Sequence, residues 1–174
     1  MIQALEKIPI SGQYEEIVFD MSWGWNGENW NFVLFTTSNG EEWCGHFRWS
    51  WSNLLVAELS SKNIACIISG GYGYLIEIDK KAKIKDISSY LITWLIADEK
   101  SSSFIISTFW DITQINDELE EIDLILPYQA DGIVLKEYKN RKINLEIEFI
   151  GANERFNNDY YIDLDEMKIK QHNQ

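Results

Sequence analysis

The 174-residue chain has few of the residues on which metal sites and disulfide-built folds depend. It contains two cysteines, two histidines and two prolines. Two cysteines cannot build a disulfide framework. Because Cys44 and Cys66 lie in apolar, strand-like segments, we expect both thiols to be reduced and buried. His46 and His172 have no zinc-ligand spacing. The composition therefore predicts no metal site and no cofactor.

Basic residues are also scarce. Lys and Arg number 15 against 28 Asp and Glu, which gives a net charge of −13. This balance argues against binding to nucleic acid or to anionic membranes, and it favours a basic protein partner. No run approaches the ~18 apolar residues that span a bilayer. The N-terminus has no signal-peptide pattern. We expect a cytoplasmic protein that folds as one domain over residues 1–174.

Catalytic motifs are absent as well. GGYG (70–73) lacks the G-K-[S/T] ending of a phosphate-binding loop and precedes a strand pattern, so it predicts a tight turn. No nucleophile elbow is present. Glu146 and Glu148 share one face of a predicted strand, as do Asp163 and Asp165. Such carboxylates could form a glycosidase pair, but a solvated charged face is the simpler interpretation. The sequence predicts a protein that is not an enzyme.

What the chain does contain is a succession of short β-patterned segments separated by turn residues. WNFVLFT (30–36) and EEWCGHFR (41–48) flank Asn39-Gly40, a strong hairpin signal. KINLEIEFI (142–150) alternates apolar and polar residues, as a strand with one solvated face does. The segment 85–97 fits either a helix or a strand, and its Ile, Thr, Trp and Tyr content favours a strand at 90–96.

The second half of the chain resembles the first. A shift of 79 positions places Ile64 on Ile143 and Cys66 on Leu145, and YLIEID (74–79) then matches YYIDLD (160–165) after a short gap. This repeat predicts a mainly β fold with little helix, in which two antiparallel blade-like meanders share one core. The repeat units span 30–84 and 104–169. Alternation predicts the following core residues: Phe32, Leu34, Ile64, Cys66, Ile68, Ile76, Ile78, Ile143, Leu145, Ile147, Ile162 and Leu164.

Four segments carry a resemblance to a family of small β-rich bacterial proteins without an established function. They are GGYGYLIEID (70–79), STFWDITQIND (107–117), ADGIVLKEYKNRKI (130–143) and DYYIDLDEM (159–167), and together they cover about 70–169. The chain departs from the family pattern where ILPYQADG replaces a Trp before Asp-Gly, and where Thr-Gly is missing after the last strand. Some members resemble immunity proteins encoded beside toxins. The resemblance implies a fold and a possible role, but no catalytic residues.

Tryptophan is concentrated at 23–51, which holds six of the eight in the chain. WGWNGENW (23–30) and RWSWS (48–52) place tryptophans two apart, and therefore on one face of a strand. These rings could cap a β-core, anchor a protein partner or stack on a sugar. We predict a partner-binding surface in which an acidic connector adds charge to the rings: Trp23, Trp25, Trp49, Trp51, Glu118, Glu120, Glu121 and Asp123.

These features favour a stoichiometric protein-binding module, most concretely an immunity or inhibitor protein that neutralises a basic bacterial toxin. An acidic surface would steer such a partner and occupy its basic site. A carbohydrate-binding β-domain is one alternative. A structural module that pairs through open sheet edges is another.

Overall fold

The computed structural model describes residues 1–19, 30–48, 54–150 and 155–172. These residues form sixteen strands in four sheets of four strands each, with no helix among them. Sheet A has the order β1-β3-β4-β2 and consists of β1 (Ile2–Leu5), β2 (Glu15–Val18), β3 (Trp30–Thr36) and β4 (Glu42–Arg48). Its strand β2 runs parallel to β4, and every other strand pair in the four sheets is antiparallel.

The other three sheets are simple meanders in chain order. Sheet B contains β5 (Leu55–Leu59), β6 (Ile64–Ser69), β7 (Tyr72–Glu77) and β8 (Ala82–Tyr90). Sheet C contains β9 (Trp94–Asp98), β10 (Ser103–Ser107), β11 (Ile112–Ile115) and β12 (Glu121–Asp123). Sheet D contains β13 (Ala130–Lys139), β14 (Lys142–Ile150), β15 (Arg155–Asp163) and β16 (Lys168–Gln171).

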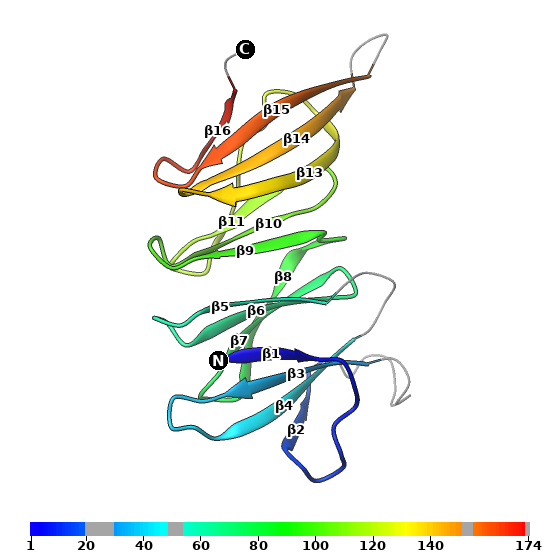
Figure 1. The fold of residues 1–174 in the computed structure, drawn as a ribbon, viewed down its shortest axis with the longest axis vertical. Helices are drawn as coiled ribbons and strands as arrows, with labels where there is room; N and C mark the ends of the chain where they lie inside the picture. The colour runs from blue at the N-terminus through cyan, green and yellow to red at the C-terminus, as the bar shows by residue number, and fades with distance from the viewer. Residues whose placement is uncertain (20–29, 49–53, 151–154, 173–174) are drawn as a thin grey trace.

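The sheets stack face to face in the order A, B, C, D along the long axis of the molecule (Figure 1). Each neighbouring pair encloses its own core, so three apolar layers separate the four sheets. Strand β6 shows how this works: Cys66 packs towards sheet C, and its neighbour Ile67 packs towards sheet A. Strand β10 is likewise buried along its whole length. The inner sheets therefore need apolar residues on both faces.

The prediction of a mainly β fold with blade-like meanders and little helix is confirmed. The two repeated meanders are sheets B and D. The ambiguous segment 85–97 forms strands and no helix, but the single strand expected at 90–96 was wrong, because the chain turns at 91–93 between β8 and β9. The expected single shared core was wrong, because sheet C lies between B and D and packs on both. Of the predicted core residues, Leu34 is only partly buried and the others are all buried.

The repeat is also shifted by one residue at β6, the second strand of sheet B. Tyr74 and Tyr160 are equivalent, yet Tyr74 pairs with Ile67 whereas Tyr160 pairs with Leu145. The structural equivalent of Leu145 is therefore Ile67, and the predicted match with Cys66 was wrong. The reason is physical: β6 is apolar on both faces, so its sequence has no alternation that would fix the register.

Along one side of the stack, where the strands of each sheet end, carboxylates reach from one sheet to the next. Asp79 accepts hydrogen bonds from the Ser38 N–H at 2.7 Å and from its hydroxyl at 2.5 Å. Glu99 accepts from the Ser60 N–H at 2.6 Å and from the Ser61 hydroxyl at 2.9 Å. These contacts join sheet A to B and sheet B to C. We call the ends of the sheets that carry them the bridged end.

The bridge between sheets C and D centres on Arg141. Its guanidinium bonds to buried Asp98 of sheet C, and its Nε lies 2.9 Å from Asp165. Lys100 of sheet C lies 2.8 Å from the same Asp165 carboxylate. Asp165 is the repeat equivalent of Asp79, and both residues contact the hairpin of the preceding sheet. The repeat thus preserves an inter-sheet contact as well as a strand pattern.

Candidate functional site

The predicted partner surface is only partly described by the structure. Trp23, Trp25, Trp49 and Trp51 lie outside the described residues. The acidic residues are described, and they lie in the turn after β11 and on β12. Glu118, Glu120 and Asp123 are exposed. Glu118 and Glu120 therefore precede the edge strand of sheet C, and Glu121 and Asp123 lie on it.

Glu121 differs from its acidic neighbours because its carboxylate is used within the fold. It lies 3.0 Å from Lys85 Nζ and 3.0 Å from the Ser88 N–H, and it also accepts from the Ser88 hydroxyl. Burial alone would disfavour its charge, but these donors outweigh burial, and the pKa of Glu121 lies below its ordinary value. Its role is to join β12 of sheet C to β8 of sheet B, and so it contributes little free charge for a partner.

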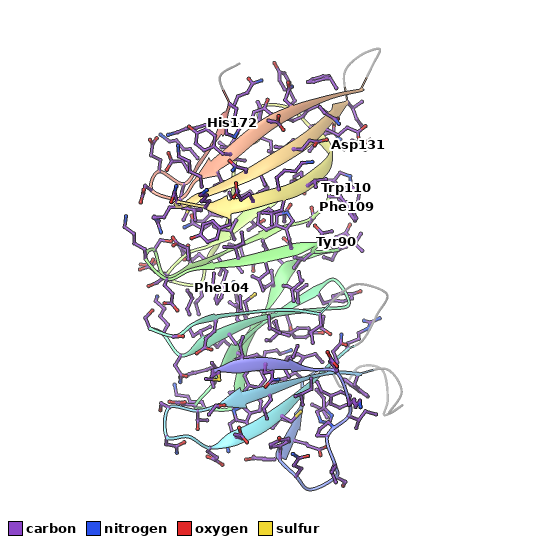
Figure 2. All side chains as sticks on the ribbon, viewed as in Figure 1. Tyr90, Phe104, Phe109, Trp110, Asp131 and His172 are labelled. Atoms are coloured by element: carbon purple, nitrogen blue, oxygen red, sulfur yellow. The ribbon has the colours of Figure 1, made fainter. Side chains whose placement is uncertain are left out.

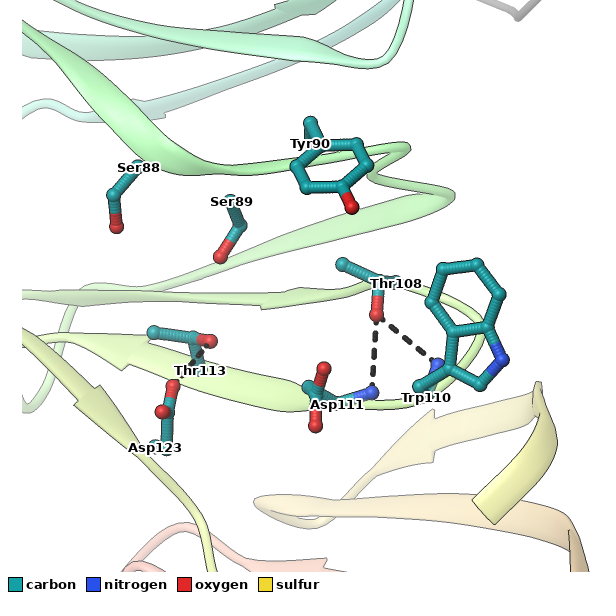
Figure 3. Close-up of a pocket in the computed structure, with 8 residues that line it drawn as sticks. All are labelled: Ser88, Ser89, Tyr90, Thr108, Trp110, Asp111, Thr113 and Asp123. Carbon is teal, nitrogen blue, oxygen red and sulfur yellow. Dashed lines mark hydrogen bonds between the residues drawn. The ribbon is translucent and has the colours of Figure 1, made fainter. Parts of the chain in front are cut away.

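Beside Glu121 a pocket of about 280 Å³ opens between sheets B and C. Its wall on sheet B is the end of β8, and its wall on sheet C comprises β11, β12 and the turn 108–111 (Figure 3). The lining combines hydroxyl groups, two aromatic rings and two carboxylates: Ser88, Ser89, Tyr90, Thr108, Trp110, Asp111, Thr113 and Asp123. None of these lining residues is basic.

The turn 108–111 has a fixed shape that places Trp110 and Asp111 at the pocket. The Thr108 hydroxyl oxygen accepts hydrogen bonds from the N–H groups of Trp110 and Asp111, each at 3.0 Å. The Thr108 N–H donates to the Asp111 carbonyl at 3.0 Å. This is the local pattern by which threonine stabilises a tight turn. The side chains of Trp110 and Asp111 are therefore held by the backbone and project outwards.

The two carboxylates of the pocket are available to different degrees. Asp123 accepts a hydrogen bond from the Thr113 hydroxyl at 2.9 Å, which orients it. The Asp111 carboxylate has no hydrogen-bond or ion-pair partner in the described part of the chain. Negative charge without a cation is thus concentrated at one wall of the pocket.

Large apolar side chains surround the pocket on the solvent side. Tyr90 is 64% exposed and Trp110 is 42% exposed. Phe109 packs against Trp110 with ring centroids 6.0 Å apart, and Tyr72 is the cross-strand partner of Tyr90. Figure 2 shows Tyr90, Phe109 and Trp110 on one side of the molecule. These residues form a strip across sheets B and C. With Leu91, they define what we call the open end: Tyr72, Tyr90, Leu91, Phe109 and Trp110.

Leu91 adds an unfavourable backbone conformation to this surface. Its φ is 58°, in the left-handed region that leucine avoids, and its side chain is 46% exposed. The Cα of Leu91 lies against Gly71, where an added Cβ would approach it to 3.2 Å. Left-handed strain at non-glycine residues is concentrated at functional sites. An exposed leucine in this conformation is consistent with a role outside the folding of the chain itself.

The cysteines and histidines do not add a reactive centre to the described residues. Burial raises the pKa of the Cys44 thiol to about 12, and burial also raises the pKa of Cys66. Both thiols are free, buried and inert as nucleophiles. Burial lowers the pKa of His46, against the opposing effect of Glu16. No group of three potential metal ligands occurs among the residues that the structure describes.

Sequence reasoning missed Tyr90, Trp110 and Asp111 as site residues. STFWDITQIND contributes only to the family resemblance, because its pattern does not show which rings a neighbouring sheet covers. The signal that could have found them is the pair of adjacent aromatics, Phe109 and Trp110, directly before an aspartate in a turn. Two neighbouring rings at a turn cannot both face the same core.

Comparisons with known proteins add no assignment: no family model matches the chain, and no curated protein is significantly similar to it. In the described parts of the chain, no helix is long and apolar enough to cross a membrane.

Proposed function

We propose that this protein is a stoichiometric binding module for a basic protein, most concretely an immunity or inhibitor protein that neutralises a basic bacterial toxin. The observation that supports this most directly is the open end. There, exposed aromatic rings surround a pocket with two carboxylates and no basic lining residue. Central aromatic anchors and a charged periphery are the usual composition of tight protein interfaces.

The charge of the whole chain supports the same proposal. A net charge of −13 attracts a basic partner over a distance and accelerates the encounter. The exposed carboxylates of Glu118 and Glu120 lie in the connector that leads to β12. That connector lies at the opposite end of β11 from Trp110, so these carboxylates would steer the partner from a distance and mainly change the association rate. The rings of Tyr90 and Trp110 would instead determine how slowly the complex dissociates.

The test is to purify the chain with the basic protein encoded by the adjacent gene and to measure their complex. We expect a complex of defined stoichiometry with submicromolar affinity, and co-expression should restore growth inhibited by that protein. The variant Trp110→Ala should weaken binding by at least about 30-fold, the loss expected at an interface hot spot. The matched control is Tyr138→Ala, which removes an exposed ring from sheet D. Absence of binding at micromolar concentrations would contradict the proposal.

A second candidate function has one observation in its favour. The pocket combines the rings of Tyr90 and Trp110 with the hydroxyl groups of Ser88, Ser89 and Thr108, and aromatic rings next to hydrogen-bonding groups also suit sugar rings. A glycan-array experiment with the purified chain separates the two functions. Binding to a neutral glycan that Trp110→Ala abolishes would favour a carbohydrate-binding domain over an inhibitor of a basic protein.

A further inference from the structure

We infer that the pocket between β8 and the turn 108–111 is a receptor for a single arginine side chain of the partner. This inference rests on the proposed function and makes it specific, because it states which group of the basic protein enters the pocket. It is carried by three properties of the lining: the excess of hydrogen-bond acceptors, the positions of the two rings and the absence of any competing cation.

The first property is the chemistry of the lining atoms. Asp111 and Asp123 are acceptors, and the hydroxyl groups of Ser89 and Thr113 can accept as well as donate. A guanidinium has five N–H donors and no acceptor, so it complements such a lining. A neutral sugar could bond to the lining hydroxyl groups, but it would leave the charges of the two carboxylates unbalanced.

The second property is the placement of the rings. Tyr90 projects from β8 towards the turn that carries Trp110 (Figure 3). A cation that enters between the two walls would pass an aromatic face on its way to the carboxylates. Trp and Tyr rings attract cations through their negative faces, and arginine stacks on them more readily than lysine does.

The third property is that no cation among the described residues contacts the Asp111 carboxylate; Arg48, the cation at the open end, lies over the Tyr72 ring at 4.9 Å. The nearby Lys85 pairs with Glu121 at 3.0 Å. Lys83 pairs with Asp86 at 2.8 Å. The Asp111 carboxylate therefore remains available to an incoming charge. The planar fork of arginine can bridge carboxylates on two different elements, whereas the compact ammonium of lysine cannot do so equally well.

The experiment uses the full chain labelled with ¹⁵N and three probes: arginine methyl ester, lysine methyl ester and methyl glucoside. The indole signal of Trp110, assigned with Trp110→Phe, reports occupancy. We expect arginine methyl ester to shift this signal with a dissociation constant in the millimolar range, as befits a ligand of about a dozen heavy atoms. Lysine methyl ester should bind several-fold more weakly, and methyl glucoside should leave the signal unchanged.

Two variants show whether the carboxylates are responsible. Asp111→Asn should weaken arginine binding about tenfold or more, because it removes charge and keeps the shape of the side chain. Asp123→Asn should have a smaller effect. Glu137→Gln is the matched control, since it removes one exposed carboxylate from sheet D. It should leave the titration unchanged.

The outcomes separate this inference from the proposed function. A shift with methyl glucoside but not with arginine methyl ester would overturn the arginine assignment. Full-strength binding of the basic protein by Asp111→Asn would also overturn it while leaving the proposed function in place. If the chain binds arginine methyl ester but no basic protein, the arginine site is supported and the proposed function is contradicted.

Discussion

The bridged end and the open end of the sheet stack use the same kinds of residues for different purposes. At the bridged end, Asp79, Glu99 and Asp165 each bond to a neighbouring sheet. At the open end, Asp111 bonds to no described residue through its side chain, and aromatic rings face solvent. Among the described residues, these carboxylates join neighbouring sheets at the bridged end, and at the open end Glu121 joins sheets B and C while the Asp111 carboxylate has no partner.

The largest expected effect is at the bridge between sheets C and D. Arg141→Met removes the partner of Asp98, whose side chain is only 3% exposed, and leaves a buried carboxylate without its cation. We expect the free energy of unfolding to fall by about 3 kcal/mol, the lower end of the range for a broken buried ion pair, because Arg141 itself is 21% exposed. The measurement is urea denaturation at neutral pH. Lys139→Met, which removes an exposed cation two residues away, is the control and should change stability by less than about 0.5 kcal/mol.

The second largest effect is expected in acid, where the contacts of the bridged end contribute less to the free energy of unfolding. Hydrogen bonds from Ser38 lower the pKa of Asp79, and contacts with Lys100 and Arg141 lower the pKa of Asp165. For Asp98, burial opposes the charge, but Arg141 and Ser101 outweigh it and the pKa is lowered. Because each folded pKa lies below the ordinary value of 3.8, the unfolded state binds more protons in acid. These carboxylates therefore stabilise the fold above that value, and their contribution is lost as the pH falls through it and then through the folded pKa.

This pH dependence is measured as a difference, because His46 also titrates. The pKa of His46 is lowered from 6.5 by burial, so protonation of the unfolded state reduces stability below that pH in every variant. The comparison is between wild type and the triple variant Asp79→Asn, Asp98→Asn, Asp165→Asn. Their difference in unfolding free energy should be constant from pH 7 to about pH 5 and shrink below about pH 4. A difference that stays the same in acid would refute the assigned role of these carboxylates.

The sequence predicted the fold wherever one face of a strand is solvated. β14 alternates Ile143, Asn144 and Leu145, so its inner face could be read directly. β6 could not be placed to the residue, because Ala65 and Cys66 are both buried, on opposite faces. For the same reason the sequence did not reveal that sheet C separates B from D. A strand that is apolar on both sides does not show which neighbour it packs against.

The candidate site was less predictable than the fold. The acidic connector was expected, but Glu121 is used between sheets, which the sequence cannot show. Reversing the charge of Glu121 would remove its contacts with Lys85 and Ser88, so it would change stability as well as surface charge. Glu118 and Glu120 are the residues that can be changed without this loss. The exposure of Tyr90 and Trp110 depends on how two sheets meet, and no local pattern encodes it.

Two leucines with left-handed backbone conformations allow an exposed position at the open end to be compared with a packed one. Leu91 at the open end has a φ of 58°, and Leu119 has a φ of 64°. Leu119 packs against the core between sheets B and C, whereas the side chain of Leu91 is exposed. Leu91→Gly should raise the free energy of unfolding by about 0.5–1 kcal/mol, since relief of strain exceeds the added freedom of the unfolded chain. Leu119→Gly should lower it by at least about 1 kcal/mol, because packing is lost.

Thermal and urea denaturation of both glycine variants test this pair. Effects of the same sign would show that Leu91 packs as Leu119 does, and the open end would then be part of the folding core. If the signs are opposite, Leu91→Gly should also bind the basic partner more weakly. A gain in stability with a loss of binding is the pattern expected where a residue is kept for function.

The smallest effect on stability is expected at Tyr90. Tyr90→Ala removes a ring that is 64% exposed, and we expect the free energy of unfolding to change by no more than about 0.5 kcal/mol. Ile92→Ala, two residues away, truncates a side chain that is 2% exposed, and it should cost about 2–5 kcal/mol. The partner complex should respond differently to Tyr90→Ala: its dissociation should accelerate at least tenfold, because a ring beside the pocket stabilises the bound state. If Tyr90→Ala destabilises the fold as much as Ile92→Ala does, the ring belongs to the core and the open end is not a binding surface. If it changes neither stability nor dissociation, the partner binds elsewhere on the molecule.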